Sequence, residues 1–331
     1  MANSAAAASE GHVAQAARAV LARGNAVDAV VAGVLAAAAA SPGVLLGPVQ
    51  LLVAGAGAGL LAVDGRVRQP GLGAPRPRGT VAGGAVPQAA RVGVPAMPAA
   101  LAAVLAAAGS LTMRRVCLEA VEAARAVSGE RGAVLASLAK RGAPAMADEA
   151  IAGELAAVAG RTAGGVLTSR DLSSVRPALA YPKERSLDPE GWLRAPWREA
   201  AGDASRTHVI VAADHRGLLC AACYESADEG ISVPALGLLA PAFAAPVMRG
   251  QTRVRPGEPR PSAAPIAIRV RAGLADLAVG IGSLADAETA LARLLPRLDE
   301  SPLVADALGA SAGRGVAVAR TRESAVVAAS A

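Results

Sequence analysis

The most constraining feature of the sequence is a stretch from residue 29 to residue 63 that contains no charged side chain. A stretch of this length has to be buried, either in a protein core or in a lipid bilayer. About half of this one is alanine and glycine, and two prolines and two glycines interrupt it between residues 42 and 48. A membrane-spanning helix needs about 20 predominantly apolar residues in a row. We therefore expect a buried helix over residues 27–40, followed by a buried strand, and no membrane segment.

The charge of the chain argues against a nucleic-acid partner. Its formal net charge of +6 comes almost entirely from arginine, because Lys140 and Lys183 are the only lysines. Proteins that bind nucleic acids typically cluster their basic residues and interleave them with aromatic side chains. Here the arginines are scattered, and aromatic residues make up 2% of the chain. We expect a globular protein that binds no nucleic acid.

The cysteines and the first residues indicate a compartment. Cys117, Cys220 and Cys223 are too few for a disulfide framework in a chain of 331 residues, which is typical of a reducing environment. Residues 1–11 are small and polar and do not show the basic and apolar regions of a secretory signal. The expected location is therefore the cytoplasm.

The predicted elements change in kind along the chain. Residues 1–180 are helix-rich, residues 181–206 are the most polar segment, and residues 207–331 are strand-rich. We interpret 181–206 as an exposed connection that could hold a processing site between two halves of one interleaved fold. Helices are expected at 12–23, 27–40, 98–109, 116–127 and 284–295, the last closed by Pro296, and strands at 49–53, 60–63, 209–213, 218–224, 266–270, 274–279, 316–319 and 325–328. Near-continuous apolar strands are typical of sheets covered on both faces, so the predicted fold class is a layered α/β architecture.

One cysteine motif requires a choice between chemistry and packing. Cys220 and Cys223 form a C-x-x-C pair, which at the start of a helix could be redox-active or half of a zinc site. In this chain the pair falls in a predicted strand, where positions three apart face opposite sides. His208 and His215 are near in sequence, but the same alternation keeps four ligands from converging. We interpret the pair as two core cysteines and expect neither a metal nor a cofactor.

Several short segments, spread over most of the chain, match the motifs of one known family in the same order. These segments would rarely all match in that order by chance. They are Gly24-Asn25-Ala26-Val27-Asp28-Ala29, Gly153-Glu154-Leu155-Ala156, the run Gly-Gly-Val-Leu-Thr-Ser-Arg-Asp-Leu at 164–172, Arg176-Pro177 and Ala328-Ala329-Ser330.

Together these segments resemble the signatures of the γ-glutamyltransferase family, in a shortened and diverged form. The resemblance implies a four-layer αββα sandwich of the N-terminal-nucleophile hydrolases. It also implies a precursor that cuts itself before a threonine, whose new amine and hydroxyl act as base and nucleophile. The implied partners are a small-molecule amide or peptide substrate and, after cleavage, a heterodimer of the chain's own two fragments.

The resemblance places the nucleophile at Thr207. The family's strand ends in an Asp-x-x-Gly turn, and an ungapped count back from the turn at 214–217 reaches Thr207. A competing register matches Thr207-His208 to the second threonine and the histidine of the family's Thr-Thr-His version, and it puts Arg206 at the nucleophile position. The ungapped register is favoured because a gap inside a buried strand moves every later side chain to the other face.

Other family positions fall on altered residues. The family's paired oxyanion glycines correspond to Ser283 and Leu284, whose backbone N–H groups would have to serve instead. The double-serine segment is reduced to Ser262, and Arg76 is the expected substitute for the arginine that binds a substrate carboxylate. The threonine that steadies the nucleophile in the family falls near Glu225.

Two functions therefore follow from the sequence. The first is a γ-glutamyltransferase-like amidohydrolase or acyl transferase that cleaves itself before Thr207 and acts on a γ-glutamyl or related amide. The alternative is a catalytically inactive homologue with a structural or regulatory partner role, which the altered substrate-binding and oxyanion positions favour. Self-cleavage distinguishes the two.

Overall fold

The structure is a computed structural model of the 331-residue chain. It describes residues 4–55, 57–75, 77, 79–184, 187–188, 191–197, 204–300, 304–309, 314–320 and 326–330.

Helices come mainly from the first half of the chain and strands mainly from the second. The helices are α1 (Gly11–Leu21), α2 (Ala26–Ala40), α3 (Met97–Ala108), α4 (Met113–Val127), α5 (Gly129–Arg141), α6 (Glu149–Ala159), α7 (Ser169–Ser174), α8 (Ala287–Glu300) and α9 (Val304–Gly309). The strands are β1 (Ala5–Ala8), β2 (Val49–Ala54), β3 (Leu60–Gly65), β4 (Ala178–Ala180), β5 (Trp192–Leu193), β6 (Thr207–Ala213), β7 (Leu219–Glu225), β8 (Gly230–Val233), β9 (Leu238–Pro241), β10 (Ile266–Arg271), β11 (Leu274–Gly282), β12 (Arg314–Arg320) and β13 (Val326–Ser330).

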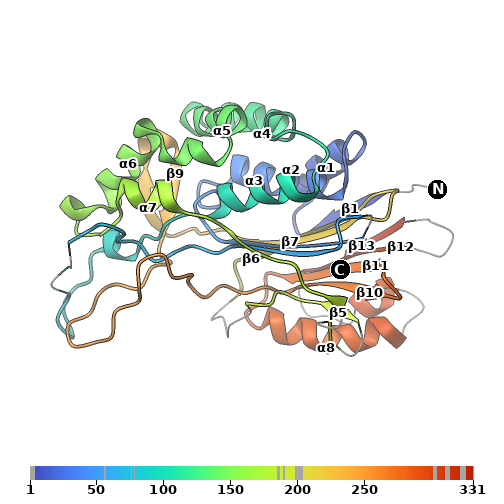
Figure 1. The fold of residues 1–331 in the computed structure, drawn as a ribbon. Coiled ribbons are helices and arrows are strands. Elements are labelled where there is room, and N and C mark those ends of the chain that lie inside the picture. Colours follow the sequence, from blue (N-terminus) through green and yellow to red (C-terminus); the bar gives the residue numbers. More distant parts are fainter. Residues whose placement is uncertain are drawn as a thin grey trace.

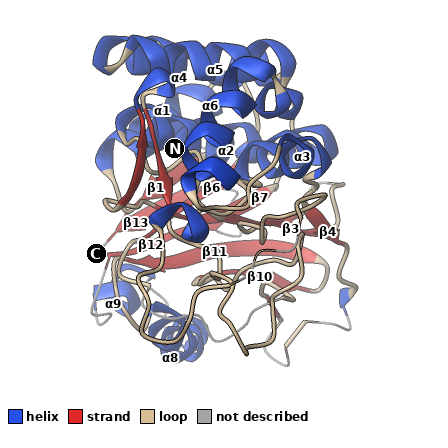
Figure 2. Ribbon diagram, turned by 90° about the vertical axis from the view of Figure 1, so that its left-hand side faces the viewer, coloured by secondary structure: helices blue, strands red, loops and turns tan. Residues whose placement is uncertain are grey.

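These elements stack in four layers. A six-stranded antiparallel sheet has the order β1-β6-β7-β2-β3-β4, and a five-stranded antiparallel sheet has the order β13-β12-β11-β10-β5. Figure 1 shows the two sheets packed face to face, with α1 to α6 outside the first sheet and α8 outside the second. Figure 2, turned by 90°, shows the same order of helix, sheet, sheet and helix. The predicted αββα sandwich is confirmed.

Strand β6 illustrates how the sequence produces these layers. Successive side chains of a strand point to opposite faces of its sheet. Ile210 and Ala212 lie in the cluster under the helices, while Val209 and Val211 lie in the cluster between the two sheets. Both faces are covered by protein, so the strand is apolar along almost its whole length, as its sequence predicted.

The uncharged stretch forms a buried helix and buried strands. Helix α2 is packed against α1, α3 and α4 as well as β6 and β7, so nearly all of its side chains are buried and apolar. At Gly33 the approach is closest, because an added Cβ would lie 2.2 Å from Cδ1 of Ile210. Within the described residues, no helix is both long and apolar enough to cross a bilayer.

Two of the short segments identified in the sequence are helix caps. At the start of α2, Asn25 and Asp28 form a reciprocal capping box. The buried Asp28 carboxylate also accepts the N–H groups of Ser110 and Leu111 at 3.0–3.1 Å. The element that most resembles a family signature therefore joins the start of α2 to the loop between α3 and α4.

The second cap has the same design. Thr168 and Asp171 form the capping box of α7, and the Asp171 carboxylate accepts the N–H groups of Gly71 and Leu72 at 2.8–3.1 Å. This cap joins α7 to the glycine-rich loop around residue 71. Both signatures therefore stabilise the fold by satisfying buried backbone donors.

Three expectations about local structure need correction. The segment 181–206 is not exposed throughout, because Trp192 and Leu193 form β5 and are each 2% exposed. Helix α8 does not end before Pro296 but continues to Glu300. Pro296 lies on the exposed side of the helix, where water can bind the carbonyl that loses its donor. Residues 5–8, for which no element was predicted, form β1 beside β6.

Candidate active site

Thr207 is the first residue of β6 and is buried. It shares its face with Val209, so its side chain points into the space between the two sheets. Its backbone N–H donates to the carbonyl of Ala204 at 2.9 Å. Its Oγ1 is shielded from solvent and has no hydrogen-bond partner among the described residues. A buried hydroxyl without a partner costs about 1–3 kcal/mol, so its presence in a folded protein calls for an explanation.

Ser283, the expected oxyanion position, lies against Thr207. Its backbone N–H donates to the Thr207 carbonyl at 2.8 Å. Ser283 has a φ of +57°, in the left-handed region that glycine adopts most easily. Leu284 comes next and packs beside the cluster under α8. In the intact chain, the Ser283 N–H is thus already bound to the strand that carries Thr207.

Glu225 lies directly opposite Thr207. The two residues are Cα partners across β6 and β7, so their side chains emerge on the same face of the sheet. The hydroxyl of Ser262 donates to the Glu225 carboxylate at 2.6 Å. Burial raises the pKa of Glu225 above its usual range, although the Ser262 hydrogen bond and the charge of Arg206 act to lower it. Ser262 therefore belongs to the site but already binds a carboxylate of the protein itself.

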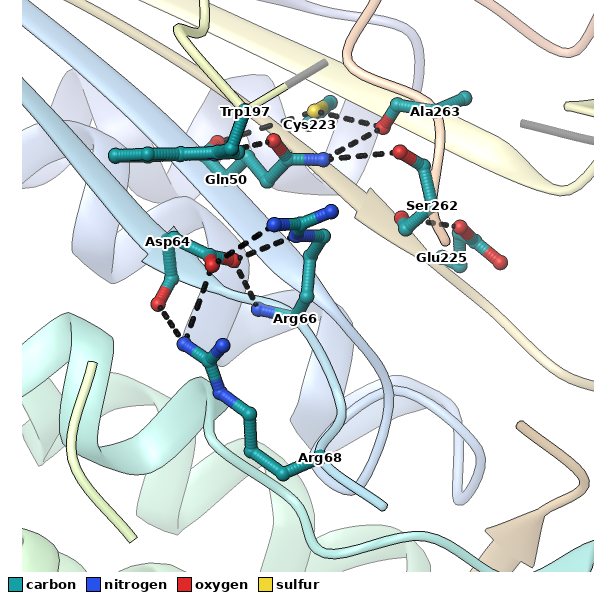
Figure 3. A network of polar contacts seen from close by, with 9 residues as sticks. All are labelled: Gln50, Asp64, Arg66, Arg68, Trp197, Cys223, Glu225, Ser262 and Ala263. Carbon is teal, nitrogen blue, oxygen red and sulfur yellow. Dashed lines mark hydrogen bonds and ion pairs between the residues drawn. The ribbon is translucent and has the colours of Figure 1, made fainter. Parts of the chain in front are cut away.

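The polar network continues from Glu225 across β2 (Figure 3). The side-chain amide of Gln50 donates to the carbonyls of Ser262 and Ala263, each at 3.2 Å. The indole N–H of Trp197 donates to Gln50 Oε1 at 2.8 Å. This hydrogen bond connects Trp197, in the segment that precedes β6, to Gln50 on β2.

A buried charge cluster lies further along the same face, on β3 and just beyond it. The Asp64 carboxylate pairs with Arg66 at 3.0 Å and with Arg68 at 3.2 Å, and Figure 3 shows it between the two guanidinium groups. Desolvation by burial is the largest influence on Arg68 and lowers its pKa. Arg76, the expected carboxylate-binding residue, lies outside the described residues.

The cysteines are core residues, as predicted from strand alternation. Cys220 lies in the cluster under the helices and Cys223 in the cluster between the sheets. Cys117, Cys220 and Cys223 are all free and buried. Burial raises the pKa of the Cys117 thiol to about 12 and raises the pKa of the other two further.

On the helix side of β6, a second polar cluster was not identified from the sequence. The Tyr224 hydroxyl donates to the carboxylate of Glu10 at 2.6 Å, and the His208 ring stacks on Tyr224 with centroids 5.4 Å apart. Burial is the largest influence on His208 and lowers its pKa. Neither Glu10 nor Tyr224 belongs to a recognisable motif, so only the folded chain brings the three together.

The comparisons with known proteins agree on the architecture. No protein-family model and no curated protein matches the sequence. Among solved structures, a protein named LmbA2991 shares 15% sequence identity, with 99% of this chain and 96% of that chain covered and a TM-score of 0.72. A cephalosporin acylase from Bacillus halodurans also shares 15% identity, with 99% of this chain and 93% of that chain covered and a TM-score of 0.72. The chain therefore has the αββα fold of the N-terminal-nucleophile hydrolases.

Proposed function

We propose that this protein is a γ-glutamyltransferase-like amidohydrolase or acyl transferase that cleaves itself before Thr207 and then uses Thr207 as its nucleophile. One observation carries the proposal: the Thr207 hydroxyl is buried at the start of β6 without a hydrogen-bond partner among the described residues. An attacking hydroxyl needs a lone pair that is not already engaged, and an N-terminal threonine supplies its own base after cleavage.

The geometry around the bond to be cut supports self-cleavage. The carbonyl oxygen of Arg206 accepts the backbone N–H of Ser226 at 3.1 Å. Attack by Thr207 Oγ1 on the Arg206 carbonyl carbon would place negative charge on that oxygen, where a fixed N–H donor stabilises it. Collapse would break the peptide bond and leave an ester on Thr207. Hydrolysis of the ester would free the Thr207 amine and hydroxyl.

The interleaved sheets favour a product whose two fragments remain associated. Strand β6 lies between β1 and β7, so one of its neighbours belongs to each fragment. Strand β5, which precedes the cut, pairs with β10, which follows it. Each fragment thus completes a sheet of the other. A heterodimer of the two fragments is the expected mature form.

The proposed substrate is a small-molecule amide, γ-glutamyl or related. The acylase fold neighbour is named for a cephalosporin substrate, and an N-terminal nucleophile acts on the acyl carbon of an amide in the same way whatever the acyl group. In this chain Arg68 already forms an ion pair with Asp64, and the Glu225 carboxylate lies opposite the proposed nucleophile in the sheet. Both features favour a related amide over an acyl group that bears a free α-carboxylate.

Intact-mass measurement of the purified protein tests this function. Two fragments, the smaller beginning at Thr207, are expected for the native sequence, and a single chain is expected for Thr207→Ala. Thr207→Ser is the matched variant, because it keeps the hydroxyl and should still cleave. A native chain that stays whole, and is indistinguishable from Thr207→Ala in amide hydrolysis, would favour the inactive homologue instead.

A further inference from the structure

The feature that the proposed function leaves unexplained is the partly buried carboxyl group of Glu225. The carboxyl group lies at the edge of the apolar cluster between the two sheets, where burial removes part of its hydration and raises its pKa. One fixed hydrogen bond, from Ser262 to Oε1, orients the group. The bond leaves Oε2 as the oxygen able to accept a proton.

The strand register places Glu225 opposite Thr207, with both side chains on the same face of the sheet. Because the N–H of Ser226 donates to the carbonyl of Arg206, these two residues form a hydrogen-bonded pair of the antiparallel ladder. Thr207 and Glu225 form the next pair, which is of the non-hydrogen-bonded type. Side chains approach most closely in such pairs, with Cα atoms about 4.5 Å apart.

Self-cleavage needs a group that accepts the proton of the Thr207 hydroxyl. The Thr207 amine that would serve as base in the mature protein is still an amide, since its N–H donates to Ala204. His208 cannot serve, because the next residue of a strand points to the opposite face and its ring stacks on Tyr224 there. Glu225 is the group whose position fits the need.

Resting on the proposed function, we infer that Glu225 is the proton acceptor and donor for self-cleavage before Thr207. Its carboxylate takes the proton from Thr207 Oγ1 as Oγ1 bonds to the carbonyl carbon of Arg206. The same proton passes to the Thr207 nitrogen as the C–N bond breaks, which leaves an ester and a free amine. Water then hydrolyses the ester to the Arg206 carboxylate and the Thr207 hydroxyl, and the proton released goes to the free Thr207 amine, so atoms and charges balance.

The groups around Glu225 define how this step depends on pH. Arg206 lies next to Thr207 and lowers the pKa of Glu225, as does the Ser262 hydroxyl, while burial raises it. Among the described residues, Cys223 on the same strand is also titratable, and the charges of Glu225 and of Glu288 on α8 both raise the pKa of its thiol. The proton acceptor must be ionised, so the cleavage rate should rise with pH through the raised pKa of Glu225 and then level off.

The test is the rate of self-cleavage of the full chain made by cell-free synthesis. Synthesis is stopped, the precursor is diluted into buffers of different pH, and the fragment that begins at Thr207 is followed by gel and intact mass. Glu225→Gln, which keeps the shape and can still accept from Ser262, should slow cleavage at least ~100-fold and abolish the rise with pH. Glu229→Gln removes the same charge from an exposed position on the following turn and should cleave at the native rate.

A second variant keeps the test decisive if Glu225→Gln folds poorly. Ser262→Ala removes the hydrogen bond that lowers the Glu225 pKa, so the rise in rate should move to higher pH with a similar plateau. Native cleavage together with unchanged rates and pH profiles in Glu225→Gln and Ser262→Ala would overturn this inference alone. A native chain that never cleaves would overturn the proposed function and this inference with it.

Discussion

The backbone N–H of Ser283 donates a 2.8 Å hydrogen bond to the carbonyl of Thr207, so the end of β11 is fixed to the first residue of β6. The contact joins the two sheets where the proposed nucleophile lies. Gly282, the last residue of β11, makes this approach possible, because an added Cβ would lie 2.8 Å from the Thr207 carbonyl oxygen.

Gly282→Ala is therefore expected to destabilise the fold by about 1–3 kcal/mol, because backbone atoms of β6 would have to move. Gly153→Ala is the matched control. Gly153 lies inside α6 with open space around its Cα, so alanine should stabilise the protein by about 0.5–1 kcal/mol. Urea unfolding of the two variants should give shifts of opposite sign. Equal shifts would contradict the close packing at Thr207.

Asp28→Ala should be among the most destabilising single changes. The buried carboxylate accepts hydrogen bonds from the backbone of Asn25, Ser110 and Leu111, and its loss leaves these donors without a partner. We expect a loss of about 3 kcal/mol or more. Glu122→Ala, which removes one exposed ion pair with Arg125, should change stability by less than ~0.5 kcal/mol. Similar unfolding midpoints for both variants would rule out a structural role for the Asp28 cap.

The partly buried His208 ring makes stability depend on pH. Its pKa is lowered in the folded protein, whereas an unfolded histidine titrates near ~6.5. Below that pH the unfolded state binds more protons, so His208 lowers stability as pH falls and has no such effect well above ~6.5. Glu10, Asp228, Arg314 and His12 act on the ring as well.

The measurement is thermal unfolding at pH 7.5 and at pH 5.5. The native protein should lose more stability between these two values than His208→Phe, which keeps a ring against Tyr224 but cannot bind a proton. Parallel losses in the two proteins would show that the His208 ring is accessible to protons in the folded state.

The cysteine thiols should be unreactive in the folded protein. All three are buried, and burial raises the pKa of each, to about 12 for Cys117. Ellman's reagent at pH 8 should label none of them until denaturant is added, after which Cys117, Cys220 and Cys223 should all react. Rapid labelling of Cys220 and Cys223 in the native state would instead support a redox-active pair.

The layers could be predicted from the sequence because a segment that is buried on both faces has apolar residues at nearly every position. Uncharged stretches and near-continuous apolar strands indicated which segments lie inside, and α2, β6 and β7 appear within a few residues of their expected bounds. Strand β1 could not be predicted, because an alanine run carries no period and its pairing with β6 joins residues about 200 positions apart. Pro296 was expected to end α8, but its exposed position allows the helix to continue.

The site was predictable only in part. Counting from the turn at Asp214 placed Thr207, and the aligned loop placed Ser283, and the structure brings these two together. The sequence could not show that the Ser262 hydroxyl already donates a hydrogen bond to the Glu225 carboxylate, because that bond depends on how a loop packs against a strand. The motifs that resembled a family most closely, around Asp28 and Asp171, are helix caps rather than reacting groups.

Intact mass combined with N-terminal sequencing of the purified native chain and of Thr207→Ala tests the nucleophile most directly. We predict two fragments for the native protein, with the smaller one starting at Thr207, and one unbroken chain for Thr207→Ala. A native protein that remains a single chain, or one cut at another bond in both proteins, would contradict the assignment of Thr207.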